Sequence, residues 1–208
     1  MTMMMAALHD GKGAMRVTEV STPEVGAEDA LVRVCRTGIC GSDLLWYGEN
    51  RTAESIPGGH EVAGEIVEVG QDVDRARIGD RVAVETIGHG LACGLCWFCR
   101  IGQFRQCLEK AANQGGGFAD YIVRRAFGCY TITSDLSWAE AALVEPFAVS
   151  VHGVRRGEMK GGETVAVLGA GNIGLTAVAA ARELGAGRVL ASARHEHQAD
   201  MARRLGAD

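Results

Sequence analysis

The cysteines of this sequence are not spread evenly along the chain. Four of the seven lie within one short stretch as Cys93, Cys96, Cys99 and Cys107, with the spacing C-x2-C-x2-C-x7-C. Each two-residue gap lets the chain turn and present another thiolate to the same tetrahedral ion. Bacterial iron–sulfur proteins begin with the same two gaps, but their fourth cysteine follows after three residues and precedes proline. Here the gap is seven and Leu108 follows, so the spacing favours a four-thiolate structural zinc over an iron–sulfur cluster or chance crowding.

A second set of metal-ligand residue types lies earlier, beside glycines at expected strand ends. Cys40 is followed by glycine, and the pair His60 and Glu61 is preceded by one. A further carboxylate, Glu145, stands just before a proline. Catalytic zinc needs three protein ligands and one exchangeable position. Cys40, His60 and either carboxylate could supply them, although a lone cysteine is usually a core residue and a lone histidine a satisfied polar one.

A glycine-rich motif occurs near the end of the chain. It consists of Gly169, Gly171, Asn172, Ile173 and Gly174 in the pattern G-x-G-x-x-G. The motif follows an apolar stretch at 164–168 and precedes an alanine-rich stretch at 175–184, which is the strand–turn–helix context that dinucleotide binding requires. In that context the pyrophosphate lies at the helix N-terminus, where free N–H groups favour anions. An ordinary tight turn is the alternative.

The end of the next expected strand indicates which dinucleotide binds. An NAD site usually places Asp or Glu there to accept hydrogen bonds from the ribose hydroxyls. Here Ala193 takes the place of the acid, and Ser192, Arg194 and His195 surround it. These three side chains could receive a 2′-phosphate, so the sequence predicts NADP in preference to NAD. Alternatively, they are surface residues that begin a loop.

These residues must be held by two different kinds of structure. From Met5 to about Tyr130, short runs in which Val and Ile alternate with charged residues predict half-buried strands of a barrel or sandwich. The clearest runs are 30–34, 65–70 and 80–84. We expect Cys35 and Cys129 to be small core residues of these strands.

The second kind of structure contains helices. Ser137 and Glu140 predict a capped helix, and Pro146 predicts the first turn of another. Then strands at 164–168 and 188–192 alternate with helices at 175–184 and 197–205, which is typical of a parallel sheet. The chain therefore divides into residues 1–145, with a cysteine lobe at about 88–110, and residues 146–208, a linker helix with the first part of a nucleotide-binding fold.

The bulk properties exclude several classes of protein. Apolar residues make up 47% and charged residues 23%, which excludes wholesale disorder. A net charge of -5 provides no basic surface, so a zinc-ribbon nucleic-acid binder is not expected. No apolar run approaches the roughly 18 residues that a membrane span needs. The start lacks the features of a signal peptide, so we expect a cytoplasmic protein.

Taken together, the ordered motifs resemble the zinc-dependent medium-chain dehydrogenase family, and within it the sorbitol, idonate and threonine dehydrogenase branch. The resemblance covers essentially the whole chain and is carried by Gly38-Ile39-Cys40-Gly41-Ser42-Asp43, Gly59-His60-Glu61, the four-cysteine lobe, Glu145-Pro146 and the glycine turn. It implies a GroES-like β-barrel domain followed by a Rossmann domain. It also implies two zinc ions per chain and hydride transfer between a primary or secondary alcohol or polyol and NAD(P).

The resemblance also implies roles for single residues. The catalytic zinc ligands would be Cys40, His60, Glu61 in some states, and Glu145 directly or through water. Ser42 matches the hydroxyl that relays a proton from the substrate. Asp43 matches the carboxylate that orients the ligating histidine, which fixes its tautomer. A homo-oligomer is a candidate assembly.

One departure concerns length. The sequence stops at Asp208, after two strands of the nucleotide fold, whereas family members continue and return to complete the catalytic domain. We therefore expect a chain truncated at its C-terminus. The alternative to an enzyme is a zinc-binding relative that is non-catalytic, or inactive without the missing part.

Overall fold

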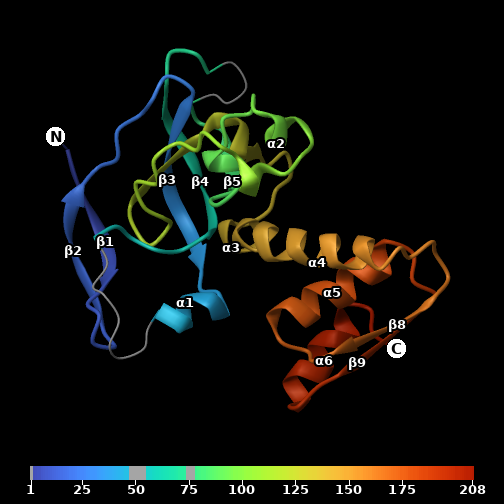
Figure 1. The fold of residues 1–208 in the computed structure, drawn as a ribbon. Coiled ribbons are helices and arrows are strands. Elements are labelled where there is room, and N and C mark those ends of the chain that lie inside the picture. The colour runs from blue at the N-terminus through green and yellow to red at the C-terminus, as the bar shows by residue number, and fades with distance from the viewer. Residues whose placement is uncertain (1, 47–54, 74–77) are drawn as a thin grey trace. The chain divides into compact units, whose positions relative to one another are not determined.

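The computed structural model describes residues 2–46, 55–73 and 78–208, and the chain forms two compact units, Met1–Leu143 and Val144–Asp208 (Figure 1). We refer to them as unit 1 and unit 2. The sequence places the boundary two residues later, between 145 and 146. Among the described residues, no helix combines the length and apolar character that crossing a membrane requires.

The strands of unit 1 pair in antiparallel fashion. A two-stranded ribbon is formed by β1 (Met3–His9) and β2 (Met15–Ser21). A five-stranded sheet has the order β6-β3-β4-β5-β7. Its strands are β3 (Asp29–Gly38), β4 (Glu61–Val69), β5 (Arg81–Val84), β6 (Tyr121–Arg125) and β7 (Cys129–Thr131). Its core contains Val32, Ile66 and Ile122, each at most 1% exposed. The predicted β-rich first part is confirmed.

The pairing of β3 with β4 has two irregularities. The register passes from Leu31↔Glu68 to Val32↔Ile66, and then from Val34↔Gly64 to Arg36↔Ala63. The second shift leaves Cys35 without a partner on β4. An unpaired extra residue of this kind interrupts the alternation of side chains between the two faces of the sheet. The prediction that Cys35 is a core residue is therefore wrong, because it is only half-buried.

Short helical segments connect these strands. They are α1 (Gly41–Trp46), η1 (His89–Leu91), α2 (Trp97–Arg100), η2 (Phe104–Gln106), η3 (Ala126–Gly128) and α3 (Trp138–Ala142). The capping box predicted at α3 is present, because Ser137 accepts the N–H of Glu140 while the Glu140 carboxylate accepts that of Ser137. Cys129 is 6% exposed, so its predicted core position is confirmed.

Unit 2 is an alternation of helices and parallel strands. Its elements are α4 (Val144–Arg156), β8 (Thr164–Leu168), α5 (Asn172–Glu183), β9 (Arg188–Ser192) and α6 (Glu196–Arg204). Strands β8 and β9 pair in parallel, as the sequence predicts. Helix α4 begins at Val144, two residues before Pro146. Proline is tolerated in the first turn of a helix, because the backbone N–H that it lacks would have no partner within the helix there.

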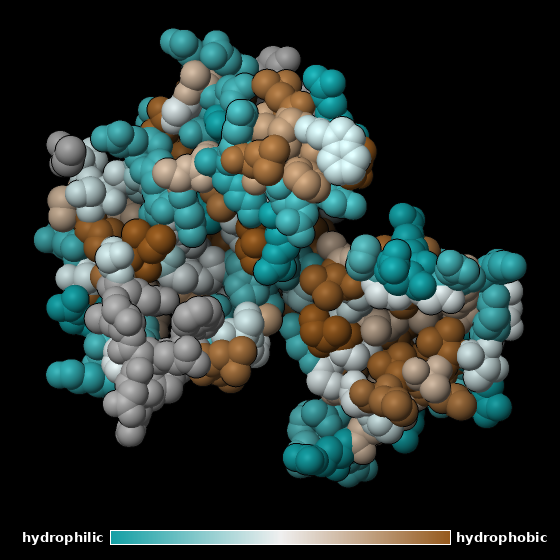
Figure 2. Space-filling model, viewed as in Figure 1, coloured by the Kyte–Doolittle hydropathy of each residue, from teal (hydrophilic) through white to brown (hydrophobic). Residues whose placement is uncertain are grey.

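Unit 2 packs around a small apolar core but leaves apolar surface exposed. Val178 and Val189 are completely buried between α5 and β9. Ser150 on α4 bonds the Thr176 hydroxyl on α5 at 2.7 Å. Figure 2 shows apolar surface on the visible side of this unit. The exposed apolar side chains of the unit include Leu168, 90% exposed, and Ile173, 46% exposed. Parallel strands are usually covered on both faces, so unit 2 has an incompletely covered sheet.

Candidate metal centres and nucleotide turn

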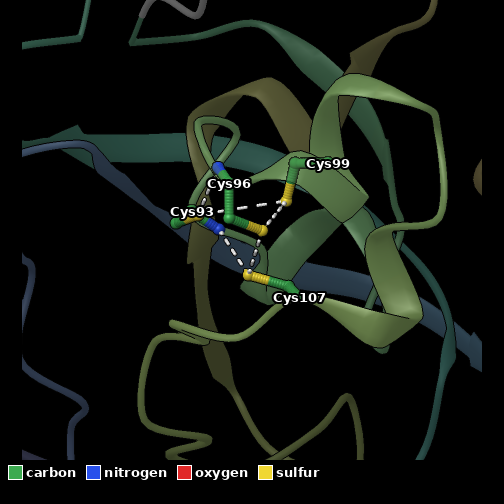
Figure 3. A group of neighbouring side chains, drawn as sticks. All are labelled: Cys93, Cys96, Cys99 and Cys107. Carbon is green, nitrogen blue, oxygen red and sulfur yellow. Dashed lines mark hydrogen bonds between the residues drawn. The ribbon is translucent and has the colours of Figure 1, made fainter.

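The four clustered cysteines point their sulfur atoms toward one another (Figure 3). Cys96 Sγ lies 3.5 Å from Cys99 Sγ and 3.9 Å from Cys107 Sγ, and Cys93 Sγ lies 3.9 Å from Cys99 Sγ. Zinc bonds thiolates at ~2.3 Å, so the edges of a Zn-S4 tetrahedron are about 3.8 Å long. The observed separations fit such a site. They are far longer than a disulfide bond of about 2.0 Å.

Backbone groups favour thiolates in this lobe. The N–H groups of Leu108 and Cys99 lower the pKa of the Cys96 thiol to about 6. The Cys93 sulfur lies 3.4 Å from the N–H of Cys96, and the Cys107 sulfur 3.2 Å from that of Cys93. Burial raises the pKa of Cys99 to about 12, so its thiol would lose its proton when metal binds. This donor set suits a structural zinc.

The second group consists of Cys40, His60 and Glu61. One ligand atom from each lies within 4.8 Å of the others. The β3–β4 pairing explains this proximity, because Gly38 at the end of β3 is opposite Glu61 at the start of β4. Cys40 lies just beyond β3 and His60 just before β4, so the two meet at the same end of the sheet. Gly59, with φ of +90°, makes the turn into His60 that other residues rarely adopt.

Asp43 connects two members of this group. Its Oδ2 accepts the backbone N–H of Cys40 at 2.8 Å, and its Oδ1 lies 3.5 Å from Nδ1 of His60. A carboxylate on that side of the ring favours a proton on Nδ1 and leaves Nε2 as the ligand atom. The group thus offers a thiolate, an imidazole and the carboxylate of Glu61, and the carboxylate of Asp43 lies behind the histidine. This donor set fits a catalytic zinc.

Glu61 is held in a tight space. Its side chain is buried at 3% exposure, and burial raises the pKa of its carboxyl group, with Asp43 adding repulsion that His60 opposes. A Cβ atom at Gly38 would lie 1.9 Å from Glu61 Oε2. Glycine at position 38 therefore provides the room that this carboxylate occupies.

We expect Gly38→Ala to weaken metal binding at this group, because the new methyl group displaces the Glu61 carboxylate. Overpacking of this kind costs about 1–3 kcal/mol, and zinc affinity should fall by about tenfold or more. Gly41→Ala is the matched control, since a Cβ there meets no atom within 4 Å. Zinc titration against a chromophoric chelator measures both variants. Equal affinity in Gly38→Ala and the control would show that Glu61 does not need this space.

Ser42 and Glu145 are also predicted for this site. Ser42 is exposed on α1, beside Asp43. Glu145 lies in the first turn of α4, in unit 2. The roles of both, as proton relay and as further ligand, stay predictions.

A pocket of about 1020 Å³ in unit 1 adjoins the second group, because Asp43 and His60 are both part of its wall. Apolar side chains, among them Ile39 and Leu44, line it as well. The wall also includes Arg124 and Asn113, which sequence reasoning did not single out. No motif marks them, since only folding brings Asn113 of a loop and Arg124 of β6 to this pocket.

The glycine motif forms the turn between β8 and α5. Gly169 has φ of +104°, and its N–H donates to Ser192 Oγ at 3.0 Å. A Cβ at Gly174 would lie 1.7 Å from the carbonyl oxygen of Gly169, so only glycine lets the helix pack here. A Cβ at Gly171 would meet nothing within 4 Å. The protein does not itself fill that space, which suits the close approach of a dinucleotide backbone.

The predicted 2′-phosphate residues are Ser192, the last residue of β9, and Arg194 and His195, which follow the strand. Arg194 and His195 are exposed, and their backbone N–H groups both donate to Gln198 Oε1 at 3.2 Å. His195 caps α6, and its ring stacks on that of His197 with centroids 5.5 Å apart. Sequence reasoning missed Gln198 and His197, although a Gln three residues after a helix cap is a known signal.

Comparisons with known proteins match nearly all of the chain. Residues 26–134 match the family model described as the alcohol dehydrogenase GroES-like domain. The chain is 36% identical to a sorbitol dehydrogenase of Bacillus subtilis and 39% identical to an L-threonine 3-dehydrogenase of Burkholderia thailandensis, each over 98% of this chain and 60% of the relative. A crystal structure of a putative zinc-binding dehydrogenase from Sinorhizobium meliloti, bound to NADP, superposes with a TM-score of 0.84 at 35% identity, covering 100% of this chain and 61% of that one.

The chain thus spans about 60% of the length of the curated relatives it matches. The matches run through both units, since they include nearly all of this chain. The predicted architecture, a GroES-like β-rich part followed by a partial parallel sheet, is confirmed. The chain therefore belongs to the zinc-dependent medium-chain dehydrogenase family, to which its alcohol dehydrogenase GroES-like domain assigns it.

Proposed function

We propose that this protein is a zinc-dependent dehydrogenase that oxidises a primary or secondary alcohol or polyol and passes the hydride to NADP in preference to NAD. The observation that carries the proposal is the convergence of Cys40, His60 and Glu61 beside a large pocket. The dehydrogenase names of its relatives support it. In this proposal the four-cysteine lobe binds one zinc, and the second group binds another.

A zinc ion with three protein ligands acts as a Lewis acid and lowers the pKa of a bound alcohol. The protein's own residues would prepare that position. Asp43 orients His60 through the contact at Nδ1 and fixes the loop at Cys40 by accepting its N–H. Ser42 would take the substrate proton, and Glu145 would act as a further ligand.

The nucleotide turn of unit 2 would bind the cofactor. Residues Gly169 to Gly174 would hold the pyrophosphate at the start of α5, where free N–H groups favour anions. Arg194, His195 and Ser192 would hold the 2′-phosphate that distinguishes NADP from NAD. The S. meliloti structure was determined with NADP bound, which supports this choice. We further propose a cytoplasmic protein that acts as a homo-oligomer.

The test measures reduction of NADP and NAD by this protein with a panel of alcohols, together with cofactor affinity by fluorescence titration. We expect Arg194→Ala to weaken NADP binding by about tenfold, since a charge-assisted bond to phosphate is lost, and to change NAD binding little. Arg204→Ala is the control, because Arg204 is likewise an exposed arginine but lies at the last residue of α6, away from the end of β9. Equal loss for both cofactors would count against the NADP assignment. Zinc-loaded protein that reduces neither cofactor with any alcohol would refute the dehydrogenase proposal.

A further inference from the structure

Arg124 is a charged residue in a largely apolar sheet. It lies on β6, is 3% exposed, and follows the buried Ile122 and Val123. Its Nε donates to the carbonyl oxygen of Thr86 at 3.0 Å, its Nη1 to the carbonyl oxygen of Val123 at 2.7 Å, and its Nη2 to Asn113 Oδ1 at 3.3 Å. All three acceptors are neutral. They fix the position of the guanidinium, but none of them is an ion-pair partner.

The neighbouring arginine is paired quite differently. Arg125 lies 2.9 Å from Glu28 and 3.3 Å from Asp29. Among the ion pairs formed by the described part of the chain, none includes Arg124. Burial lowers the pKa of Arg124 to about 10, so it still carries its charge at neutral pH. A buried charge bonded only to neutral oxygens costs free energy, which a nearby anion would offset.

The carboxylates that attract Arg124 from a distance are already engaged. Glu85 and Asp29 both act on it electrostatically. The Glu85 carboxylate accepts the N–H groups of Gly88 at 2.9 Å and Gly90 at 2.8 Å. The Asp29 carboxylate bonds Arg125. Neither is therefore a dedicated partner of Arg124.

Arg124 belongs to the wall of the pocket that also adjoins the candidate catalytic group. His60 and Asp43 line this pocket together with Arg124. Of the other charged residues on the wall, Arg36 is exposed, and Asp120 accepts a backbone N–H of β1 at 2.8 Å. Two arginines thus share the pocket with two aspartates, one of which is close to His60. Neither arginine of the wall forms an ion pair with a residue that the structure describes.

We propose that the substrate is an alcohol that also carries an anionic group, a carboxylate or a phosphate, and that Arg124 binds this group. A guanidinium has five N–H donors, so Arg124 keeps donors for an anion besides the three bonds described. Arginine is well suited to such planar, charge-assisted recognition. The apolar residues Ile39 and Leu44 would hold the carbon chain. This inference rests on the proposed function, because it places the hydroxyl group at Cys40 and His60.

Calorimetric titration of the zinc-loaded protein tests the inference with matched pairs of alcohols. The pairs are 3-hydroxybutyrate with butane-1,3-diol, and glycerol 3-phosphate with glycerol. We expect one anionic member to bind at least about tenfold more tightly than its neutral partner, and the two pairs show whether carboxylate or phosphate is preferred. Arg124→Met should abolish this preference. Arg125→Met, a change in the adjacent residue of the same strand, should retain it. Equal affinity within both pairs in the wild type would overturn the inference.

Arg124→Met removes three hydrogen bonds, so its fold is checked by circular dichroism. If it does not fold, a crystal structure of the wild type with the preferred anionic alcohol decides the matter. A carboxylate or phosphate within hydrogen-bond distance of Arg124 supports the inference. The anion elsewhere, or a carboxylate of the protein itself paired with Arg124, overturns it.

The two proposals fail in different ways. Anion-dependent binding without reduction of NADP or NAD would refute the dehydrogenase proposal and retain the anion subsite. Equal turnover and affinity for neutral and anionic alcohols would refute the anion subsite and retain the dehydrogenase proposal.

Discussion

Replacing Cys40 by alanine is expected to abolish alcohol oxidation and to lower the zinc content from two ions per chain to one. The thiolate of Cys40 is the only sulfur in the group with His60 and Glu61. Loss of a residue that merely supports a ligand costs about 10–100-fold in metal affinity or activity, so loss of a ligand should cost more than a hundredfold. Elemental analysis and initial rates measure both effects.

The fold should survive this change. Cys40 is half-buried beyond the end of β3, so removing its sulfur leaves little cavity. Cys35→Ala is the matched control, because Cys35 is a half-buried cysteine of β3, the strand that precedes Cys40, and belongs to neither metal-binding group. The control should keep two zinc ions. Unchanged turnover in Cys40→Ala would refute the catalytic assignment.

Replacing Cys99 by serine is expected to destabilise unit 1 before it affects the chemistry. Structural zinc supplies folding free energy directly, and the lobe has little core besides the cysteines, since Cys99 and Cys107 are themselves among its buried residues. We expect a loss of roughly 3–5 kcal/mol, or about 10 °C or more in the thermal midpoint. Differential scanning calorimetry and zinc analysis measure these quantities.

The same substitution at Cys35 separates the effect of metal loss from that of a sulfur-to-oxygen change. Cys35→Ser should shift the midpoint by only a degree or two, since Cys35 is half-buried, and keep both zinc ions. Turnover of Cys99→Ser, measured well below its midpoint, should remain close to that of the wild type. A normal midpoint and zinc content in Cys99→Ser would contradict a structural zinc in the lobe.

The parts of the protein that short-range patterns determine could be predicted from the sequence. The spacing of Cys93 to Cys107 is local, and a four-thiolate geometry needs little else. The turn from Gly169 to Gly174 is likewise fixed by neighbouring residues, and its strand–turn–helix context is present in the structure.

The contacts that depend on pairing between strands could not be predicted. Nothing in the sequence shows that Gly38 lies opposite Glu61, or that glycine is needed there to make room for a carboxylate. Arg124 and Arg125 illustrate the same limit. Alternation along a strand places neighbours on opposite faces, but it does not say which of two adjacent arginines is buried. The half-buried position of Cys35 could not be predicted for a related reason, because no pattern of neighbouring residues marks an irregularity in strand pairing.

The two irregularities between β3 and β4 have a consequence for how this pair of strands can change in evolution. The first shift skips one residue of β4, and the second skips Cys35 of β3. The two shifts cancel, so Gly38↔Glu61 has the same register as Ala30↔Val69. A change in length within β3 would therefore do more harm than most changes in side chain. Deleting one residue there would move Cys40 out of step with His60, while leaving every ligand present in the sequence.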